Sequence, residues 1–319
     1  MSQTQTAPSE KSSAPGIVSR GGRTGDVTFK TITIAAAIFI LVTLFFVAFF
    51  LTISSIPAFT ADPADLIDGK PFIQWVIPLA IGTLIAAAIG LLLATPVAVG
   101  VALFISHLAP RRLSKPVGYV IDLLAAIPSV VYGAWGMTFF GPALVPVYLW
   151  LEEHFGFIPI FSGPVSMAGR TLLTAGIVLA VMVLPIITSL CREIFIQTPK
   201  LHEEAALALG ATKWDMIKMA VFPFARAGIV SAVMLGLGRA LGETMAVAMV
   251  LSPGVLTANL IGVGNRTVPS EIALKYPEAF GDVRAELIAA GLVLFGITLI
   301  VNMTARWIVS RYSQYSGAN

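Results

Sequence analysis

The sequence predicts an all-α, polytopic integral membrane protein with six transmembrane helices, and its composition and its long apolar stretches carry this prediction. Hydrophobic residues make up 57% of the 319 residues and charged residues only 12%, whereas about 25% of a soluble domain is charged. Several uncharged stretches reach the roughly 20 residues that a helix needs to cross the hydrocarbon layer. These stretches do not alternate in polarity, as the strands of a membrane barrel would.

The apolar stretches define six helices and a tail. The predicted helices cover residues 32–53, 76–104, 117–140, 171–191, 227–251 and 287–308. Pro96 and Pro128 fall inside the second and third helices, where a proline bends or breaks a helix. Residues 1–28 are rich in Ser, Thr, Gly and Pro without apolar periodicity, which predicts a disordered tail. Residues 29–319 form the transmembrane domain.

The distribution of Lys and Arg predicts that both termini are cytoplasmic, because cytoplasmic loops carry the excess of these residues. Five cations lie in the loops on the predicted external side, and Arg239 lies inside the fifth helix. This excess lies where anionic lipid headgroups would meet it, so the net charge of +3 implies no nucleic-acid partner. The fourteen cations on the cytoplasmic side are Lys11, Arg20, Arg23, Lys30, Arg111, Arg112, Lys115, Arg192, Lys200, Lys213, Lys218, Arg226, Arg306 and Arg311.

Several function classes find no support in the residues. Cys191 is the only cysteine, the three histidines are scattered, and no phosphate-binding loop of the G-x-x-x-x-G-K-[ST] type is present. The chain is therefore not expected to be an enzyme or to hold a metal or cofactor. Two alternatives remain open: a self-sufficient secondary transporter, which would show repeats and buried ion ligands, and an intramembrane enzyme. Neither would need an ATPase partner.

The loop at residues 192–225 predicts two short helices with a joint between them. Glu203–Leu209 consists of strong helix formers. Gly210 can adopt the left-handed conformation that closes a helix. Thr212 and Asp215 match the pattern that opens the next helix, and Pro223 is expected to end it before the membrane.

The spacing of this loop resembles the EAA loop of bacterial ABC importer permeases, E-A-A-x-x-x-G-x(9)-I-x-L-P. Ala220 and Phe222 replace the usual Ile and Leu and remain apolar. The resemblance implies a type I importer permease fold and a loop whose coupling helices dock on a separate ATPase. The residues that it assigns to coupling are Glu204, Ala205, Ala206, Gly210 and Pro223.

A second constellation lies in the fifth predicted helix. Arg239 and Glu243 are four residues apart, so an unbroken helix would place them on one face, where they could pair. Charged residues inside a membrane face protein or water rather than lipid. Gly238 and Gly242 form a strip of small residues that would let another helix approach closely. There are two interpretations of the pair. It is a structural ion pair that fixes the fifth helix to its neighbours, or Arg239 contacts an anion and Glu243 holds the arginine in place.

Two strings narrow the resemblance to phosphate-specific importer permeases of the PstC type: GRALGETMAVAMV, which starts at Gly238, and AAIPSVVYGAWGM, which starts at Ala125. This resemblance implies a multi-pass subunit of the bacterial cell membrane that imports inorganic phosphate. Its implied partners are a homologous PstA-type permease, a PstB-type ATPase dimer that binds ATP and Mg²⁺, and an external PstS-type phosphate-binding protein. It also assigns Arg239 and Glu243 to the substrate pathway.

Two further features have less specific interpretations. The role of the external segment 252–287 is open; within it, residues 269–286 predict either an amphipathic surface helix or a solvated loop. Asp122, near the cytoplasmic end of the third predicted helix, is expected to be an interfacial residue rather than a gate.

The predicted topology can be tested by labelling. After replacement of Cys191 by serine, a cysteine at Asp65 or Glu152 should react with an impermeant thiol reagent in intact cells. A cysteine at Lys115 or Lys213 should not react, because both lie on the cytoplasmic side. The reverse pattern would overturn the orientation and place the EAA-like loop on the wrong side for an ATPase.

Overall fold

The computed structural model describes residues 22–252, 254 and 257–313, and every regular element in these residues is a helix. Six of its helical stretches are long and apolar enough to cross a membrane. This confirms the predicted all-α class and the predicted number of spans. The six stretches are Gly25–Thr60, Phe72–Leu108, Ser129–Phe155, Leu172–Ile196, Lys213–Leu241 and Gly281–Trp307.

The chain divides into two compact units, residues 1–50 and 51–319. The described part of the first unit belongs to α1 (Gly22–Thr60), an apolar helix whose large side chains are mostly exposed. Helix α1 begins at Gly22 and therefore includes residues 22–28, which were expected to belong to the disordered tail. The rest of that predicted tail, residues 1–21, lies outside the described residues.

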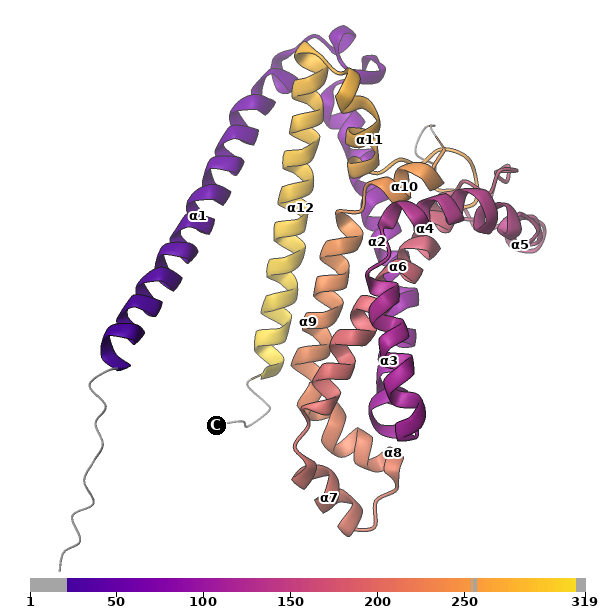
Figure 1. The fold of residues 1–319 in the computed structure, drawn as a ribbon. Coiled ribbons are helices and arrows are strands. Elements are labelled where there is room, and N and C mark those ends of the chain that lie inside the picture. The colour runs from indigo at the N-terminus through magenta and orange to yellow at the C-terminus, as the bar shows by residue number, and fades with distance from the viewer. Residues whose placement is uncertain (1–21, 253, 255–256, 314–319) are drawn as a thin grey trace, which may run out of the picture. The chain divides into compact units, whose positions relative to one another are not determined.

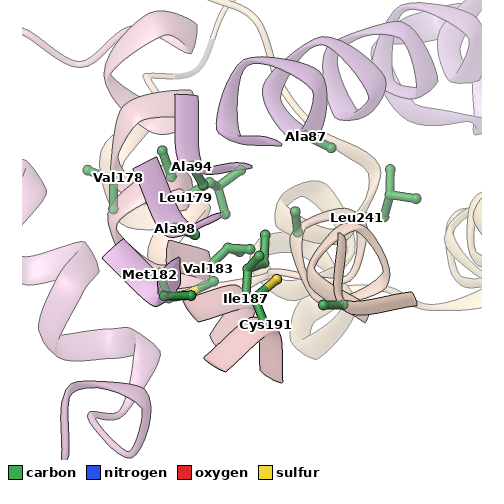
Figure 2. Close-up of a cluster of buried hydrophobic side chains, with 14 of the residues drawn as sticks. Ala87, Ala94, Ala98, Val178, Leu179, Met182, Val183, Ile187, Cys191 and Leu241 are labelled. Atoms are coloured by element: carbon green, nitrogen blue, oxygen red, sulfur yellow. The ribbon is translucent and has the colours of Figure 1, made fainter. Parts of the chain in front are cut away.

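The core of the second unit forms where α2 (Phe72–Leu103) packs along α6 (Leu172–Ile196). Helix α2 contributes a row of small residues to this contact, and Figure 2 shows Ala94 and Ala98 beside the larger side chains of α6. A Cβ atom added to Gly90 would lie only 3.1 Å from Cβ of Leu179. Small residues let two membrane helices approach closely, which increases their van der Waals contact.

The third predicted helix is broken. Helix α3 (Arg111–Ala125) ends before Pro128, and α4 (Ser129–Trp135), a π turn (Gly136–Phe140) and α5 (Gly141–Phe155) follow as a separate stretch. A single helix over residues 117–140 was therefore a wrong prediction. Pro128 has no N–H to donate, and its ring disfavours helical geometry at the residue before it. The Tyr132 hydroxyl bridges the break by donating to the Leu124 carbonyl oxygen at 2.9 Å.

Helix α3 is held against α6 by an ion pair. Arg192 lies 3.6 Å from the Asp122 carboxylate and 3.0 Å from that of Glu193. A Cβ atom at Gly118 would collide with the Arg192 guanidinium, so the glycine leaves the space that this arginine occupies. Asp122 thus has a structural partner, in line with an interfacial role rather than a gate.

The fifth predicted helix, residues 227–251, is wrong at both ends. Helix α8 (Lys213–Met216) runs through a π turn (Ile217–Val221) directly into α9 (Phe222–Leu241), so the helical stretch begins well before residue 227. It ends at Leu241, and α10 (Met245–Val250) starts after a break. In Figure 1, α7 (Lys200–Ala208) and α8 lie at one end of the bundle and α10 at the other.

A second, smaller hydrophobic core lies at the end of the bundle that is away from α7 and α8. Helix α11 (Val268–Lys275) and the start of α12 (Gly281–Ser313) pack against the first turns of α2. Three short 3₁₀ turns connect these elements: Pro63–Asp65, Ile67–Gly69 and Tyr276–Glu278. The end of α2 continues as a π turn, Phe104–Leu108, toward α3.

Two glycines of α9 provide a matched test of the packing. A Cβ atom at Gly236 would lie 2.8 Å from Val183 Cγ1 and 2.9 Å from Ile187 Cδ1, whereas one at Gly238 would meet nothing within 4 Å. We expect Gly236→Ala to lower the stability of the detergent-solubilised chain by roughly 1–3 kcal/mol, the usual effect of overpacking. Gly238→Ala should leave its melting temperature equal or higher, because alanine favours helix. Equal melting temperatures for Gly236→Ala and the unmodified chain would contradict the close contact of α6 with α9.

Candidate functional site

The joint between α7 and α8 has the geometry that the sequence predicts. Gly210 has a φ of +84°. Its N–H donates to Leu207, and the N–H of Ala211 donates to Ala206, which together form the Schellman closure of a helix. Thr212 then caps α8, because its hydroxyl oxygen accepts the Asp215 N–H at 3.2 Å. The two short helices and the glycine joint are confirmed.

One side of α7 is fixed to the bundle by one of the three scattered histidines, to which the sequence analysis assigned no contact. His107, in the π turn after α2, lies 3.3 Å from the Glu203 carboxylate through Nε2, and its Nδ1 is 2.7 Å from the Ser106 hydroxyl. Ala206 is buried on the same side of the loop. The two partners are 96 residues apart, so no local pattern could have revealed the contact.

The other side of the loop is an exposed, partly apolar surface. Leu201 is 76% exposed and Leu209 85% exposed, and the Trp214 ring, half exposed, carries Lys218 over its face at 5.2 Å. Glu204 and Ala205 are exposed on α7. The residues that were predicted to couple the chain to an ATPase therefore differ in exposure. Ala206 packs inward, whereas Glu204, Ala205 and Gly210 are exposed and can contact another protein.

Pro223 does not end a helix. It occupies the first turn of α9, inside the continuous helical stretch Lys213–Leu241. In the π turn before it, the Phe222 N–H donates to the Ile217 carbonyl five residues earlier. This wider turn accommodates the proline, which lacks the N–H that an α-helix would use. The expected stop before the membrane is therefore wrong, although Pro223 stays at its motif position.

The predicted pair of Arg239 and Glu243 is separated by the end of α9. Glu243 lies in the break before α10, is 9% exposed, and accepts the Ala246 N–H at 3.1 Å through Oε1. Arg239 is exposed on the last turn of α9 and forms no ion pair with a described residue. Four-residue spacing brings side chains together only on a continuous helix, so the expected pairing is wrong. Glu243 instead fixes the start of α10.

Arg239 faces a groove between α9, α12 and α6. The groove encloses about 1170 Å³. Gly238 also lines it, and a Cβ atom at Gly238 would meet no described atom within 4 Å. Gly242 is exposed, and a Cβ atom there would meet only atoms of its own helix. Among the described residues, no other helix packs against the two glycines, so close approach of another helix to them stays a prediction. The lining residues are Ile186, Ser231, Met234, Leu235, Gly238, Arg239, Leu299, Asn302, Met303 and Arg306.

The opposite end of the bundle carries a buried charge network. Glu271, only 3% exposed, lies 2.7 Å from both the Arg266 guanidinium and the Lys275 ammonium. Arg266 also lies 3.5 Å from Asp68. The first turn of α11 is buried, so this part of the external segment is a packed element rather than a surface helix or a solvated loop. The four-residue spacing of Glu271 and Lys275 was the available signal for one of these pairs.

No group of three or more His, Cys, Asp or Glu residues that could hold a metal ion occurs in the described part of the chain. The candidate functional features among the described residues are the exposed face of the α7–α8 loop and the groove beside Arg239.

Comparison with known proteins assigns the chain to a family. Residues 94–314 match the model of the binding-protein-dependent transport system inner membrane component. The chain is 42% identical over 318 residues to phosphate transport system permease protein PstC 2 of Mycobacterium tuberculosis, covering 95% of this chain and 97% of that protein. It is 37% identical to the protein PstC of Mesorhizobium japonicum, with both chains covered completely.

Solved structures show the same fold at much lower sequence identity. The methionine ABC transporter MetNI in an inward-facing conformation matches with a TM-score of 0.56 at 15% identity, covering 76% of this chain and 98% of that chain. A bacterial alginate ABC transporter in complex with its periplasmic protein matches with a TM-score of 0.55 at 19% identity, covering 90% and 96%. The EAA-like joint, the six spans and these matches agree: the chain belongs to the binding-protein-dependent transport system inner membrane components, the permease subunits of ABC importers, and within them to the PstC type.

Proposed function

We propose that this chain is the permease subunit of an ATP-driven importer of inorganic phosphate in a bacterial cell membrane. It forms the translocation pathway with a homologous PstA-type permease, receives phosphate from an external PstS-type binding protein, and couples to a PstB-type ATPase dimer that hydrolyses ATP with Mg²⁺. Both termini are cytoplasmic in this proposal. The names of the relatives support phosphate as the substrate.

The observation that carries the proposal is the position of Arg239. Its guanidinium is exposed to a groove among three helices of the transmembrane bundle and has no carboxylate partner among the described residues. A guanidinium donates two hydrogen bonds at once to a tetrahedral oxyanion, which suits phosphate better than an ammonium group does. An arginine in a membrane-spanning helix that only stabilised the fold would be expected to pair with a neighbouring acid.

The exposed face of the α7–α8 loop is the proposed ATPase contact. Its exposed leucines and Trp214 are large apolar groups on a loop that the charge distribution places in the cytoplasm. Exposed apolar groups that cluster with polar neighbours are typical of protein–protein contact sites. The inner face, held by His107 and Glu203, would connect such a contact to the end of α2.

The Gly210 joint provides a test of coupling. In Gly210→Glu, the added side chain meets no neighbour, so the damage should come from the positive φ, which costs a residue with a Cβ atom about 1–2 kcal/mol. We expect membrane insertion to persist while ATPase-driven uptake falls. Gly210→Asn is the matched control, because asparagine tolerates this conformation better. Unchanged uptake and ATPase association in Gly210→Glu would count against a coupling role.

The role of Arg239 is tested by uptake and assembly measured together. Arg239→Gln should lower phosphate uptake at least about tenfold, the effect of losing a charged hydrogen bond, while the complex still assembles. Arg239→Lys should rescue poorly because it keeps the charge without the planar fork. Glu243→Gln should be milder, since the amide oxygen can still accept the Ala246 N–H.

A structural role for the two residues predicts another pattern. In that case, Arg239→Gln would impair assembly, and Glu243→Gln would do so independently, because Glu243 fixes the start of α10 rather than pairing with Arg239. Loss of uptake that only accompanies loss of the assembled complex would exclude the pathway role. Co-purification is a further check, because a secondary transporter or an intramembrane enzyme would not retain an ATPase.

A further inference from the structure

The groove that contains Arg239 is also lined by a second arginine, Arg306. The distribution of Lys and Arg in the sequence predicted only that this residue lies on the cytoplasmic side. Arg306 belongs to α12 and lines the same groove. Its side chain is exposed and forms no ion pair with a described residue. The two cations therefore border one open space.

The two arginines stand at opposite ends of this space. Helices α9 and α12 are neighbours that run antiparallel (Figure 1). On α9 the lining runs from Ser231 to Arg239, a rise of about 12 Å, and on α12 from Leu299 to Arg306, a rise of about 10 Å. Because the helices are antiparallel, Arg306 lies toward the end of the groove near Ser231, away from Arg239.

The groove between them is suited to an anion. The lining contains no Asp or Glu. No carboxylate in the groove therefore neutralises the arginines or repels an anion. Asn302 is half-buried and lies one turn before Arg306 on α12, where its amide can donate a hydrogen bond. Ser231 already donates its hydroxyl proton to the Ala227 carbonyl oxygen at 2.9 Å, so it offers no further proton.

We propose that Arg306, with Asn302, forms a second oxyanion-binding site, which receives phosphate after Arg239 on the cytoplasmic side. This inference rests on the proposed function and adds a residue and a direction to it. A conduit needs binding that is strong enough for entry and divided among sites so that the ion can leave. Two arginines at opposite ends of the groove satisfy both needs, whereas a single unneutralised arginine would retain the anion.

The phosphate group could also come from an anionic lipid headgroup, because Arg306 lies toward the membrane surface. The experiment therefore uses the complete complex, with its second permease and ATPase, in vesicles of phosphatidylcholine alone or with phosphatidylglycerol. Phosphate uptake is measured for the unmodified complex and for Arg306→Gln, Arg306→Lys and Arg239→Gln. Arg226→Gln is the matched control, because Arg226 is an exposed cation of α9 that does not line the groove.

We expect Arg306→Gln to lower uptake at least about tenfold in both lipid mixtures, with Arg306→Lys intermediate, Arg226→Gln unchanged and assembly intact. Unchanged uptake in Arg306→Gln, with Arg239→Gln inactive, overturns the second site alone. A defect confined to vesicles with phosphatidylglycerol assigns Arg306 to lipid, and loss of assembly assigns it to the second permease; both overturn the site. Absence of phosphate uptake by the unmodified complex overturns the proposed function and the inference together.

A binding readout completes the test without relying on transport. Met303 is 62% exposed and lines the groove beside Arg306. With Cys191 replaced by serine, Met303→Cys should be labelled by an anionic thiosulfonate reagent, and inorganic phosphate should slow this labelling severalfold relative to chloride at equal ionic strength. Adding Arg306→Gln should remove the protection. Equal labelling rates with phosphate and chloride would overturn the second site.

Discussion

The close approach of α2 to α6 is the constraint on which the rest of the bundle depends. Lipid is as apolar as a leucine side chain, so burial of apolar surface contributes little to helix association in a membrane. The contact relies instead on the small residues of α2, which let Leu179 pack close to its backbone at Gly90. Helix α6 in turn supports α9 through Gly236 and α3 through Arg192. The groove beside Arg239 thus has one wall, α9, that α6 supports directly, while its α12 wall packs against α9.

The sequence predicted the spans and the glycine joint between α7 and α8 because both depend on local properties. Hydropathy over about 20 residues locates a membrane helix, and the glycine and threonine of the α7–α8 joint act through backbone geometry and one hydroxyl. The interruptions were harder to predict. Pro128 breaks a helix whereas Pro223 lies within a continuous stretch, because a π turn accommodates the second proline and the Tyr132 hydroxyl stabilises the break at the first.

The wrong pairing in the candidate site has a clear physical origin. Pairing of Arg239 with Glu243 assumed a helix that continues past residue 241, whereas α9 ends there. Spacing alone does not reveal where a helix ends. Arg306 escaped notice because counting charges assigns a residue to a side of the membrane but not to a face of a helix. The contact of His107 with Glu203 joins residues far apart in sequence, so only the fold reveals it.

The uninterrupted passage of the chain through Pro223 has a mechanical consequence. Residues 213–241 form one helical stretch of 29 residues, about 43 Å long. Helices bend most readily at prolines and π turns, and here both lie together at residues 217–223. Trp214 lies before this bend point and Arg239 lies beyond it, near the end of α9. A displacement imposed on the exposed face of α8 would therefore have to pass through this one turn to reach Arg239.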